Sequence, residues 1–590
     1  MKASKIFLTF TGLMIFVQSH CQITEGGISL ISESYNFTGN GKSSEIAVEG
    51  LPFSMAVRTT IGTDVTNMWD SRLTFEAIEG ISNEDVILIS FWARTLESVQ
   101  ETGEGVMTIC IEHRTTHSKE LYRRMAIGRD WRQYFIPITS NTSLDASDVG
   151  YAFHLGSPRQ VLEFADVKFI NYRNNLSVGD LPVTRATYAG REPDAPWREE
   201  AADRIRMHRR GEIEIAVRDQ NGNPAVNTQV TIEMVRHDFG FGSAISGRMF
   251  ESNPVYREKV LELFNEVVFE NDLKWGPFIS NKPNEYITRT LDALDERQIR
   301  VRGHTVVWPS FRYSPSFLRD YADDPERLRK EIDDHIKDVV SFTKGRLVDW
   351  DVINEPYSEQ EFQQILGYEV MADWFRLVRK YDPGVKLYIN DFSIISGLGM
   401  NTAHQDHYFE TIQFIEENGG QIDGIGMQGH MGYDLTSITQ VYSILERFAS
   451  LGKEIKITEH DIQMQDRELQ ADYTRDFMTI LFSHPSVKAL LNWGFWTGRH
   501  WRPDAAFYDE DWNIRPHGKV WKELVFEQWW TPETTVTTDK DGIARFEGYL
   551  GDYEYHILYR EGERSGFIRV ENSLSSGDLN KFVFSPQYNH

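Results

Sequence analysis

Two glutamates lie in apolar, strand-like segments of the sequence, where their carboxyl groups could work as a pair. Glu355 lies near the end of LVDWDVINEP (347–356), and Glu459 lies within EIKITEHDI (454–462). Hydrolysis of an acetal needs one carboxylic acid to protonate the departing oxygen and one carboxylate to capture or stabilise the oxocarbenium-like centre. Carboxyl groups roughly 5–5.5 Å apart give retention of configuration, whereas roughly 6.5–9.5 Å gives inversion. Either glutamate alone would more often be a solvated loop residue. Whether the two form a catalytic pair therefore depends on the secondary-structure elements around them.

A repeating pattern of elements could bring the two glutamates together. From about residue 237 to 530, strand-like runs alternate with helix-like segments, which is typical of parallel βα units. The eight runs cover residues 239–245, 263–271, 300–308, 347–356, 386–393, 423–430, 454–462 and 489–496. Eight units predict an α/β fold with a (β/α)8 TIM barrel, whose active site lies at the C-terminal ends of the strands. We therefore expect both glutamates at the mouth of one barrel.

Other polar and aromatic residues stand at or just after the ends of these runs. They are Glu270, Asn271, Lys274, His304, Trp308, Asn354, Asn390, Asp391, Gln428, His430, Asp461, Trp493 and Trp496. Because the strand ends of a barrel converge, reactive and ligand-binding groups are predicted around the two carboxyls. The sequence contains no HExxH or comparable spacing of metal ligands, so neither a metal nor another cofactor is expected.

Seven of these segments, in order, resemble the motifs of a known enzyme family. ENDLKW, RGHTVVW, WDVINEP, LYINDF, IDGIGMQGH, ITEHD and NWGFW are similar to the motif series of family 10 glycoside hydrolases. The resemblance covers about residues 237–530 and implies a retaining endo-β-1,4-xylanase that acts on plant xylan or xylo-oligosaccharides. It implies that Glu355 is the acid/base and that Glu459 is the nucleophile.

The same resemblance implies roles for the surrounding residues. Asn354 would hydrogen-bond the sugar 2-hydroxyl at the cleavage site. His430 would touch the nucleophile, and Asp461 would orient His430 and hold it charged, which helps to keep the nucleophile ionised. The implied sugar contacts on the glycone side are Asn271, Lys274, His304, Trp308 and Gln428. The implied aromatic platforms, whose flat rings can lie against the C–H face of a pyranose, are Trp493 and Trp501.

Several positions depart from the usual motifs of that family. Pro309 and Phe311 follow the strand-three tryptophan where His and Gln are usual, so an altered glycone-side preference is expected. His460 replaces a common Leu and should point toward the helices, because strand residues alternate between the two faces. Weaker contacts on the leaving-group side are expected from three further replacements, Phe392, Ser393 and Thr497.

The segments that flank the predicted barrel have β texture. Residues 22–178 alternate in short runs separated by turn residues, which predicts a β-sandwich that is jelly-roll-like and could be a carbohydrate-binding module. A purely structural or spacer role is the alternative. Trp92 lies in a mostly apolar strand and is predicted to be core, whereas Trp69 and Tyr122 are freer candidates for sugar contact.

Two smaller β segments border the barrel. Residues 179–236 predict a linker with a short helix, followed by a β-hairpin appendage (211–219 and 228–235) whose turn lies at 221–224. Residues 531–590 predict a C-terminal β appendage that could pair with 211–236.

The N-terminus and the composition bear on location and partners. Residues 1–21 have the charged start and apolar run of a signal peptide, so the mature chain is expected from Gln22, secreted or periplasmic. Lipid attachment at Cys21 is the less favoured alternative. Cys110 would then be the only cysteine, so neither an internal disulfide nor a Cys-based zinc site is expected.

A formal charge of −26 disfavours nucleic acid and anionic lipid as partners and suits a neutral polysaccharide. No segment predicts a membrane span, and a monomer is expected. Two alternatives to an active xylanase stay open: a catalytically weak xylan-binding barrel, and a retaining hydrolase of another β-1,4-glycan.

Overall fold

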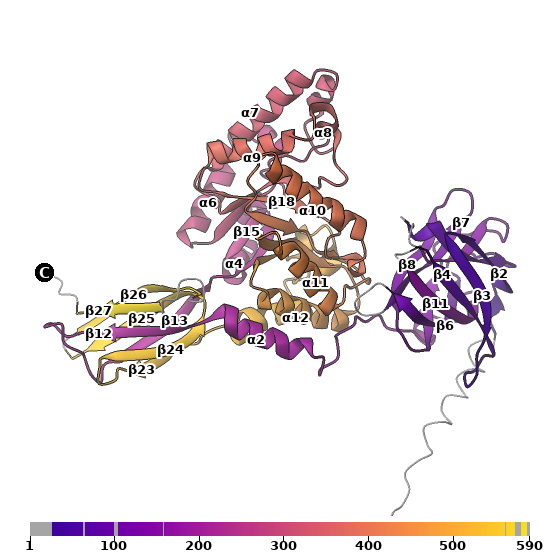
Figure 1. Ribbon diagram of the computed structural model, residues 1–590, viewed down its shortest axis with the longest axis horizontal. Coiled ribbons are helices and arrows are strands. Elements are labelled where there is room, and N and C mark those ends of the chain that lie inside the picture. Colours follow the sequence, from indigo (N-terminus) through magenta and orange to yellow (C-terminus); the bar gives the residue numbers. More distant parts are fainter. Residues whose placement is uncertain are drawn as a thin grey trace, which may run out of the picture. The chain divides into compact units, whose positions relative to one another are not determined.

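The computed structural model describes residues 26–586, apart from 63–64, 66, 99–103, 157–158, 561 and 573–579. The predicted signal peptide lies outside the described residues. The chain divides into two compact units, Met1–Ala186 and Thr187–His590 (Figure 1). Among the described residues, no helix has both the length and the apolar character that a bilayer crossing requires.

The N-terminal unit is a sandwich of two antiparallel sheets, which confirms the predicted fold of this segment. One sheet has the order β3-β4-β11-β6-β9 with β1 beside β11, and the other has the order β2-β5-β10-β7-β8. The strands are β1 (Ile28–Ser29), β2 (Ile31–Gly39), β3 (Gly41–Ala47), β4 (Met55–Ile61), β5 (Ser71–Ala77), β6 (Val86–Ser98), β7 (Gly105–His113), β8 (Lys119–Ile127), β9 (Arg132–Thr139), β10 (Val149–His154) and β11 (Gln160–Asn171). Alternate apolar residues of both sheets, among them Leu73, Phe91 and Phe153, fill the core between them.

The aromatic residues singled out in this unit differ in exposure. The prediction that Trp92 is core is wrong: its neighbours Phe91 and Ala93 belong to the core, whereas Trp92 is half-buried with its ring 5.7 Å from that of Phe53. Trp69 is 53% exposed, and Tyr122 is 38% exposed with its ring edge-on to His154. The two residues predicted to be free for contact are therefore the accessible ones.

The second unit contains a closed barrel of eight parallel strands, as predicted. Strand pairing runs β14-β15-β16-β17-β18-β19-β21-β22 and returns to β14. The strands are β14 (Gly240–Ile245), β15 (Glu266–Phe269), β16 (Arg300–Gly303), β17 (Asp349–Asn354), β18 (Lys386–Asp391), β19 (Gly424–Met427), β21 (Glu454–Ile462) and β22 (Val487–Asn492). A short extra strand, β20 (His430–Met431), pairs with the end of β21.

Helices surround the strands of the barrel (Figure 1). They are α3 (Gly247–Ser252), α4 (Pro254–Leu263), α5 (Trp275–Ser280), α6 (Glu285–Glu296), α7 (Pro325–Thr343), α8 (Glu361–Leu366), α9 (Val370–Tyr381), α10 (Thr402–Glu417), α11 (Ile438–Ala449), α12 (Arg467–Ser483) and α13 (Pro516–Glu523). The predicted start of α7 is confirmed, because the Asp324 side chain accepts a hydrogen bond from the backbone N–H of Arg327 and Pro325 occupies the first turn.

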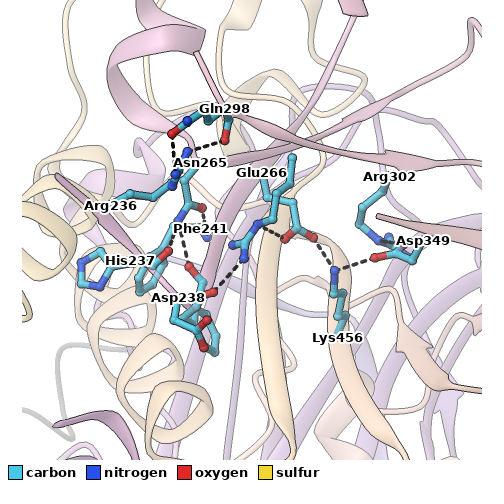
Figure 2. A network of polar contacts seen from close by, with 12 residues as sticks. Arg236, His237, Asp238, Phe241, Asn265, Glu266, Gln298, Arg302, Asp349 and Lys456 are labelled. Carbon is cyan, nitrogen blue, oxygen red and sulfur yellow. Dashed lines mark hydrogen bonds and ion pairs between the residues drawn. The ribbon is translucent and has the colours of Figure 1, made fainter. Parts of the chain in front are cut away.

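Charged side chains fill the interior of the barrel in alternating sign. Lys456 Nζ donates to Glu266 Oε1 at 2.5 Å and to Asp349 Oδ2 at 2.6 Å (Figure 2). Arg302 donates from Nε to Asp349 and from Nη2 to Asp351. All five groups are buried, and each charge has opposite charges beside it, which is the condition for tolerating ions in the interior. We call this chain, from Glu266 to Asp351, the barrel charge ladder.

The C-terminal appendage forms a small β-sandwich with the segment before the barrel. Its sheets are β24-β12-β27 and β23-β13-β25-β26, so the expected pairing between 211–236 and the C-terminal segment is present. The strands are β12 (Arg210–Val217), β13 (Gln229–His237), β23 (Thr534–Thr537), β24 (Ile543–Tyr549), β25 (Gly551–Tyr559), β26 (Gly562–Val570) and β27 (Asn580–Phe584).

The predicted hairpin of 211–235 is wrong, because β12 and β13 lie in different sheets of this sandwich. The turn signal is real, since Asp219 accepts hydrogen bonds from the N–H groups of Asn221 and Asn223. However, the C-terminal strands offer apolar partners to both strands, and burial between two sheets outweighs local pairing.

Two arginines join the ends of the barrel to its neighbours. Arg236 of β13 donates to Asp552 of β25. It also donates to Gln298, just before β16 (Figure 2). Arg209 ends helix α2 (Trp197–Arg209), within the predicted linker, and donates to the carbonyls of Phe482 and His484 at the end of α12. The linker is therefore fixed to the barrel by buried hydrogen bonds, and the appendage by more exposed ones.

Candidate active site

Glu355 and Glu459 are placed by the ends of two barrel strands. Glu459 lies in β21 and is 5% exposed, whereas Glu355 directly follows β17 and is half-buried. The backbone of Glu355 has φ 54°, in the left-handed region, and its N–H donates to the carbonyl of Asn390 in the next strand. A non-glycine residue adopts this conformation only when its surroundings fix it. The side-chain position of Glu355 is thus set by the barrel wall.

Glu459 is surrounded by groups that favour its charged form. Asn390 Nδ2 donates to Oε1 at 2.8 Å, His430 Nε2 lies 3.2 Å from Oε2, and His304 Nδ1 lies 3.9 Å from Oε1. Burial opposes ionisation, but the hydrogen bond from His430 and the neighbouring His304 and Lys274 outweigh it and lower the pKa of Glu459. The carboxylate is therefore ionised at neutral pH.

His430 is held between two carboxylates. Its Nδ1 lies 3.1 Å from Asp461 Oδ2, and its Nε2 faces Glu459. Burial alone would lower the pKa of His430, but Asp461 and Glu459 together raise it to about 9, so the ring is protonated at neutral pH. Asp461 is in turn fixed by Trp501 Nε1 at 2.8 Å and Arg502 Nη1 at 3.0 Å.

Glu355 has the opposite electrostatic surroundings. Burial is the largest influence and, with the negative charges of Glu459 and Asp391, it raises the pKa of Glu355 to about 7. The hydrogen bond from Gln428 Nε2 to Glu355 Oε1, at 2.8 Å, acts against this rise. About half of the Glu355 carboxyl groups therefore carry a proton at neutral pH, when Glu459 carries none.

The remaining predicted residues line the same strand ends. Lys274 Nζ donates to Asn271 Oδ1 at 3.0 Å and lies over the rings of Trp308 and Trp493, 5.3 and 5.9 Å from their centroids. The His304 ring meets that of Trp493 edge-on at 5.1 Å. Burial lowers the pKa of Lys274 below its usual range. Lys274 and the rings of Trp308, Trp493 and His304 together form a wall beside Glu459 that is partly polar and partly apolar.

The other predicted site residues contact each other or stand at the rim. Asn354 Oδ1 accepts from Asn390 Nδ2, which also binds Glu459, so it lies beside the nucleophile candidate. Trp501 is 55% exposed, with its ring edge-on to His430 at 4.9 Å. These contacts thus join the twelve predicted residues into two neighbouring groups, around Glu459 and around Glu355.

The departures from the family motifs have structural roles. Phe311 is buried and packs edge-on against Phe362 of α8, and its N–H donates to Glu361. The Thr497 hydroxyl donates to the carbonyl of Tyr508 and fixes the loop after β22. His460 faces the helices as expected, since its ring stacks on Phe477 of α12.

Sequence reasoning assigned no role to four residues that support the site. Asn390 joins Asn354 to Glu459, and Asp351 ends the barrel charge ladder by accepting from His304 Nδ1 at 3.0 Å. Arg502 holds Asp461, and Tyr313 stacks on Trp308 at 3.8 Å. The signal for Asn390 and Asp351 was present, because both lie in barrel strands, but loop residues Tyr313 and Arg502 gave none.

A fifth unassigned residue, Tyr357, lies two positions after Glu355. Its ring stacks on buried His404 at 3.8 Å, and His404 Nε2 lies 3.1 Å from Asp391 Oδ2. Tyr357 is 37% exposed, so an aromatic ring that is held in place by His404 is accessible near the acid/base candidate.

One group among the described residues has the ligand atoms that a metal ion would need. It consists of Cys110, Glu112 and His154 in the N-terminal unit, whose ligand atoms all lie within 4.8 Å of one another. A single cysteine can join Glu and His in a mixed ligand set, so the number of cysteines does not by itself exclude a Cys-containing site.

Curated proteins of several kinds are similar to this chain. Anti-sigma-I factor RsgI6 of Acetivibrio thermocellus is 32% identical over 371 residues, covering 61% of this chain and 46% of that protein. Endo-1,4-beta-xylanase 1 of Arabidopsis thaliana is 27% identical, covering 56% and 34%. Endo-1,4-beta-xylanase B of Thermotoga neapolitana is 29% identical, covering 52% and 94%. The chain spans less than half the length of the first two of these relatives.

Solved structures are similar over the barrel. Xylanase 10B of Thermotoga petrophila RKU-1, in complex with xylobiose, has 28% identity and a TM-score of 0.45, covering 49% of this chain and 95% of that one. The model of the family described as glycosyl hydrolase family 10 matches residues 231–523, which span the whole barrel. The barrel domain of this protein belongs to glycosyl hydrolase family 10.

Proposed function

We propose that this protein is a retaining endo-β-1,4-xylanase in which Glu355 is the acid/base and Glu459 is the nucleophile. The observation that carries the proposal is the opposite protonation of two neighbouring carboxyl groups, with the pKa of Glu355 raised to about 7 and that of Glu459 lowered. Two carboxyl groups whose pKa values are separated in this way can supply one proton donor and one charged nucleophile at the same pH. The family of the barrel and the xylanases among its relatives support xylan as the substrate.

The proposed reaction has two steps. In the first, Glu355 gives its proton to the glycosidic oxygen as the C1–O bond breaks, and Glu459 bonds to C1 to form a glycosyl-enzyme. In the second, the Glu355 carboxylate takes a proton from water, whose oxygen attacks C1 and releases Glu459. His430, protonated between Glu459 and Asp461, keeps the nucleophile ionised without donating its own proton.

Xylan would be held by the wall beside the nucleophile. Lys274, Asn271, His304 and Gln428 offer hydrogen-bond donors or acceptors for the hydroxyl groups of glycone-side sugars. The proposed aromatic contacts are Trp308, Trp493 and Trp501. Asn354, held by Asn390, is placed to bind a hydroxyl next to the reacting carbon.

The proposal is tested by the rate at which reducing ends are released from xylan. The wild type, Glu459→Ala and the control Glu326→Ala, which removes an exposed glutamate of α7, are compared. We expect loss of activity only in Glu459→Ala, and equal rates in all three proteins would refute the assignment. Parallel assays on glucan and mannan separate a xylanase from a hydrolase of another β-1,4-glycan, and tight binding without turnover would favour the xylan-binding barrel.

We also propose that the protein is exported after removal of residues 1–21 and acts as a monomer. The charged start and apolar run of this segment support export. Mass spectrometry of the protein from the extracellular or periplasmic fraction should give a chain starting at Gln22. A mass that includes a lipid on Cys21 would favour the anchored form instead. Size-exclusion chromatography with light scattering measures the oligomeric state.

A further inference from the structure

The N-terminal unit has a hollow on the outer face of one of its sheets. The sheet is β2-β5-β10-β7-β8, whose other face forms the core of the sandwich. The hollow has a volume of about 450 Å³, in the range of sites that hold small ligands, on the order of 300–1,000 Å³. Most of its lining residues carry polar side chains, among them Asn36, Arg72, Glu76, Glu112, Arg114 and His154.

The floor of this hollow holds polar groups whose hydrogen-bonding capacity is unused. His154 is 1% exposed although its side chain lies on the outer face, beside the buried side chains of Thr108 and Cys110. Neither ring nitrogen of His154 nor the hydroxyl of Thr108 has a hydrogen-bond partner among the described residues. Buried polar groups are normally satisfied, so a cluster of unsatisfied ones beside a hollow points to a ligand or to water.

Charge on the walls of the hollow is balanced. Arg72 and Arg114 line the hollow together with Glu76 and Glu112, and Glu112 is ion-paired with Lys119. Arg114 Nε donates to the carbonyl of Val149 at 2.7 Å, which holds the guanidinium at the rim. A balanced set of arginine and carboxylate groups matches a ligand with both donors and acceptors rather than an ion. Hydroxyl groups on adjacent carbons have this property.

A metal ion fits the same place less well. Cys110, Glu112 and His154 could supply three ligands, but Lys119 already neutralises Glu112. The positive charge of Arg72 also acts on Cys110 and His154 and would oppose a cation there. An uncharged ligand is not opposed by either group.

We propose that this hollow binds a short segment of a neutral β-linked polysaccharide, with Arg72, Glu112 and Arg114 bonding sugar hydroxyls over a floor of Gly150 and Ala152. The choice of xylan as that polysaccharide rests on the proposed function of the barrel. The proposed site differs from the one expected at the exposed aromatic residues Trp69 and Tyr122, because neither of them lines the hollow.

Two substitutions test the hollow by different means. Arg72→Ala removes a donor from the wall, and Gly150→Val fills the floor. An added Cβ at Gly150 would meet Arg114 Cγ at 3.4 Å, which is ordinary contact, so the strand can accept a side chain there. The matched control is Arg132→Ala, which removes an exposed arginine of β9 in the other sheet. Thermal melts of every variant confirm folding.

Binding is measured by isothermal titration of the full chain carrying Glu459→Gln, which prevents cleavage, with xylohexaose and separately with cellohexaose. We expect two sites, one of which is weakened at least tenfold by Arg72→Ala and by Gly150→Val and is unchanged by Arg132→Ala. Binding of either oligosaccharide at the sensitive site supports the proposal. Isotherms that neither hollow variant alters, or that Arg132→Ala alters equally, overturn it.

Failure of this proposal can be told from failure of the proposed function. With Glu459 intact, the two hollow variants should hydrolyse xylotetraose at the wild-type rate, because the substitutions lie outside the barrel. An inactive wild type would refute the xylanase proposal, while the titrations would still decide whether the hollow binds sugar.

Discussion

The hydrogen bond between Gln428 and Glu355 gives a pH prediction that can be worked through from the structure. Gln428 Nε2 donates to Glu355 Oε1 at 2.8 Å and so stabilises the charged form of the carboxyl. Burial and the nearby negative charges act the other way, and the balance leaves the pKa of Glu355 at about 7. Gln428→Leu removes the one hydrogen bond that favours ionisation, so the pKa of Glu355 should rise.

The size of the rise follows from the energy of a hydrogen bond to a charged group. Such bonds contribute roughly 1.5–3 kcal/mol, and each pKa unit is about 1.4 kcal/mol, so the shift should be about 1–2 units. An acid catalyst is active while it is protonated, so the alkaline limb of kcat/KM should move to higher pH by that amount. The acid limb, set by Glu459, should stay in place.

The assay is the pH dependence of kcat/KM on a soluble xylo-oligosaccharide, for wild type and Gln428→Leu. Because Gln428 is also a proposed sugar contact, KM should rise at every pH, but this change alone does not move the limb. Gln428→Glu serves as a second variant, since a further negative charge beside Glu355 should move the limb in the same direction. An alkaline limb that stays, or that moves to lower pH in Gln428→Leu, would show that Glu355 is not the group that titrates.

Three further predictions concern stability and substrate contact. Lys456→Met leaves the buried carboxylates of Glu266 and Asp349 without their shared cation. It should lower the free energy of unfolding, measured by urea denaturation, by about 3–5 kcal/mol. A loss under about 1 kcal/mol would contradict a stabilising role for the barrel charge ladder. The pKa of Glu355 is higher in the folded than in the unfolded chain, so stability should fall as pH rises from about 4.3 to about 7. Glu355→Gln should therefore raise Tm above pH 7 but not below pH 4. Equal effects of the substitution at both pH values would disprove this. Tyr357→Ala should raise KM for xylohexaose about 2- to 13-fold, with Tyr357→Phe near wild type, as expected when a stacking contact of about 0.5–1.5 kcal/mol is lost. An unchanged KM would exclude a sugar contact.

Residues of the site that lie on strands could be predicted from the periodicity of the sequence, whereas loop residues such as Lys274 and Trp501 were predicted only through the family resemblance. The two-residue period of a strand and the convergence of barrel strands are enough to put Glu459 and Asp461 on one face and His460 on the other. Arg502, which holds Asp461, comes from the loop after β22, and no local pattern determines the path of that loop. The same limit explains the wrong hairpin, since a turn signal is local but the choice of strand partner depends on residues far along the chain.

The two glutamates show that burial alone does not determine the chemistry of a carboxyl group. Burial is the largest influence on both and would raise both pKa values. What separates them is the charge of their neighbours. Glu459 faces His430 and Lys274, and through His304 it meets the end of the barrel charge ladder, where Asp351 holds that ring.

Glu355 instead has the carboxylates of Glu459, Asp391 and Glu359 as its main charged neighbours, and the hydrogen bond from the Gln428 amide acts against them. The ladder therefore matters beyond stability, because it fixes the position of His304 and, with it, one of the groups that keeps the nucleophile charged. Asp351→Asn should weaken the hydrogen bond that positions His304. The pKa of Glu459 should then rise and move the acid limb of kcat/KM to higher pH. The alkaline limb should then move less, since Asp351 is not among the largest influences on the pKa of Glu355.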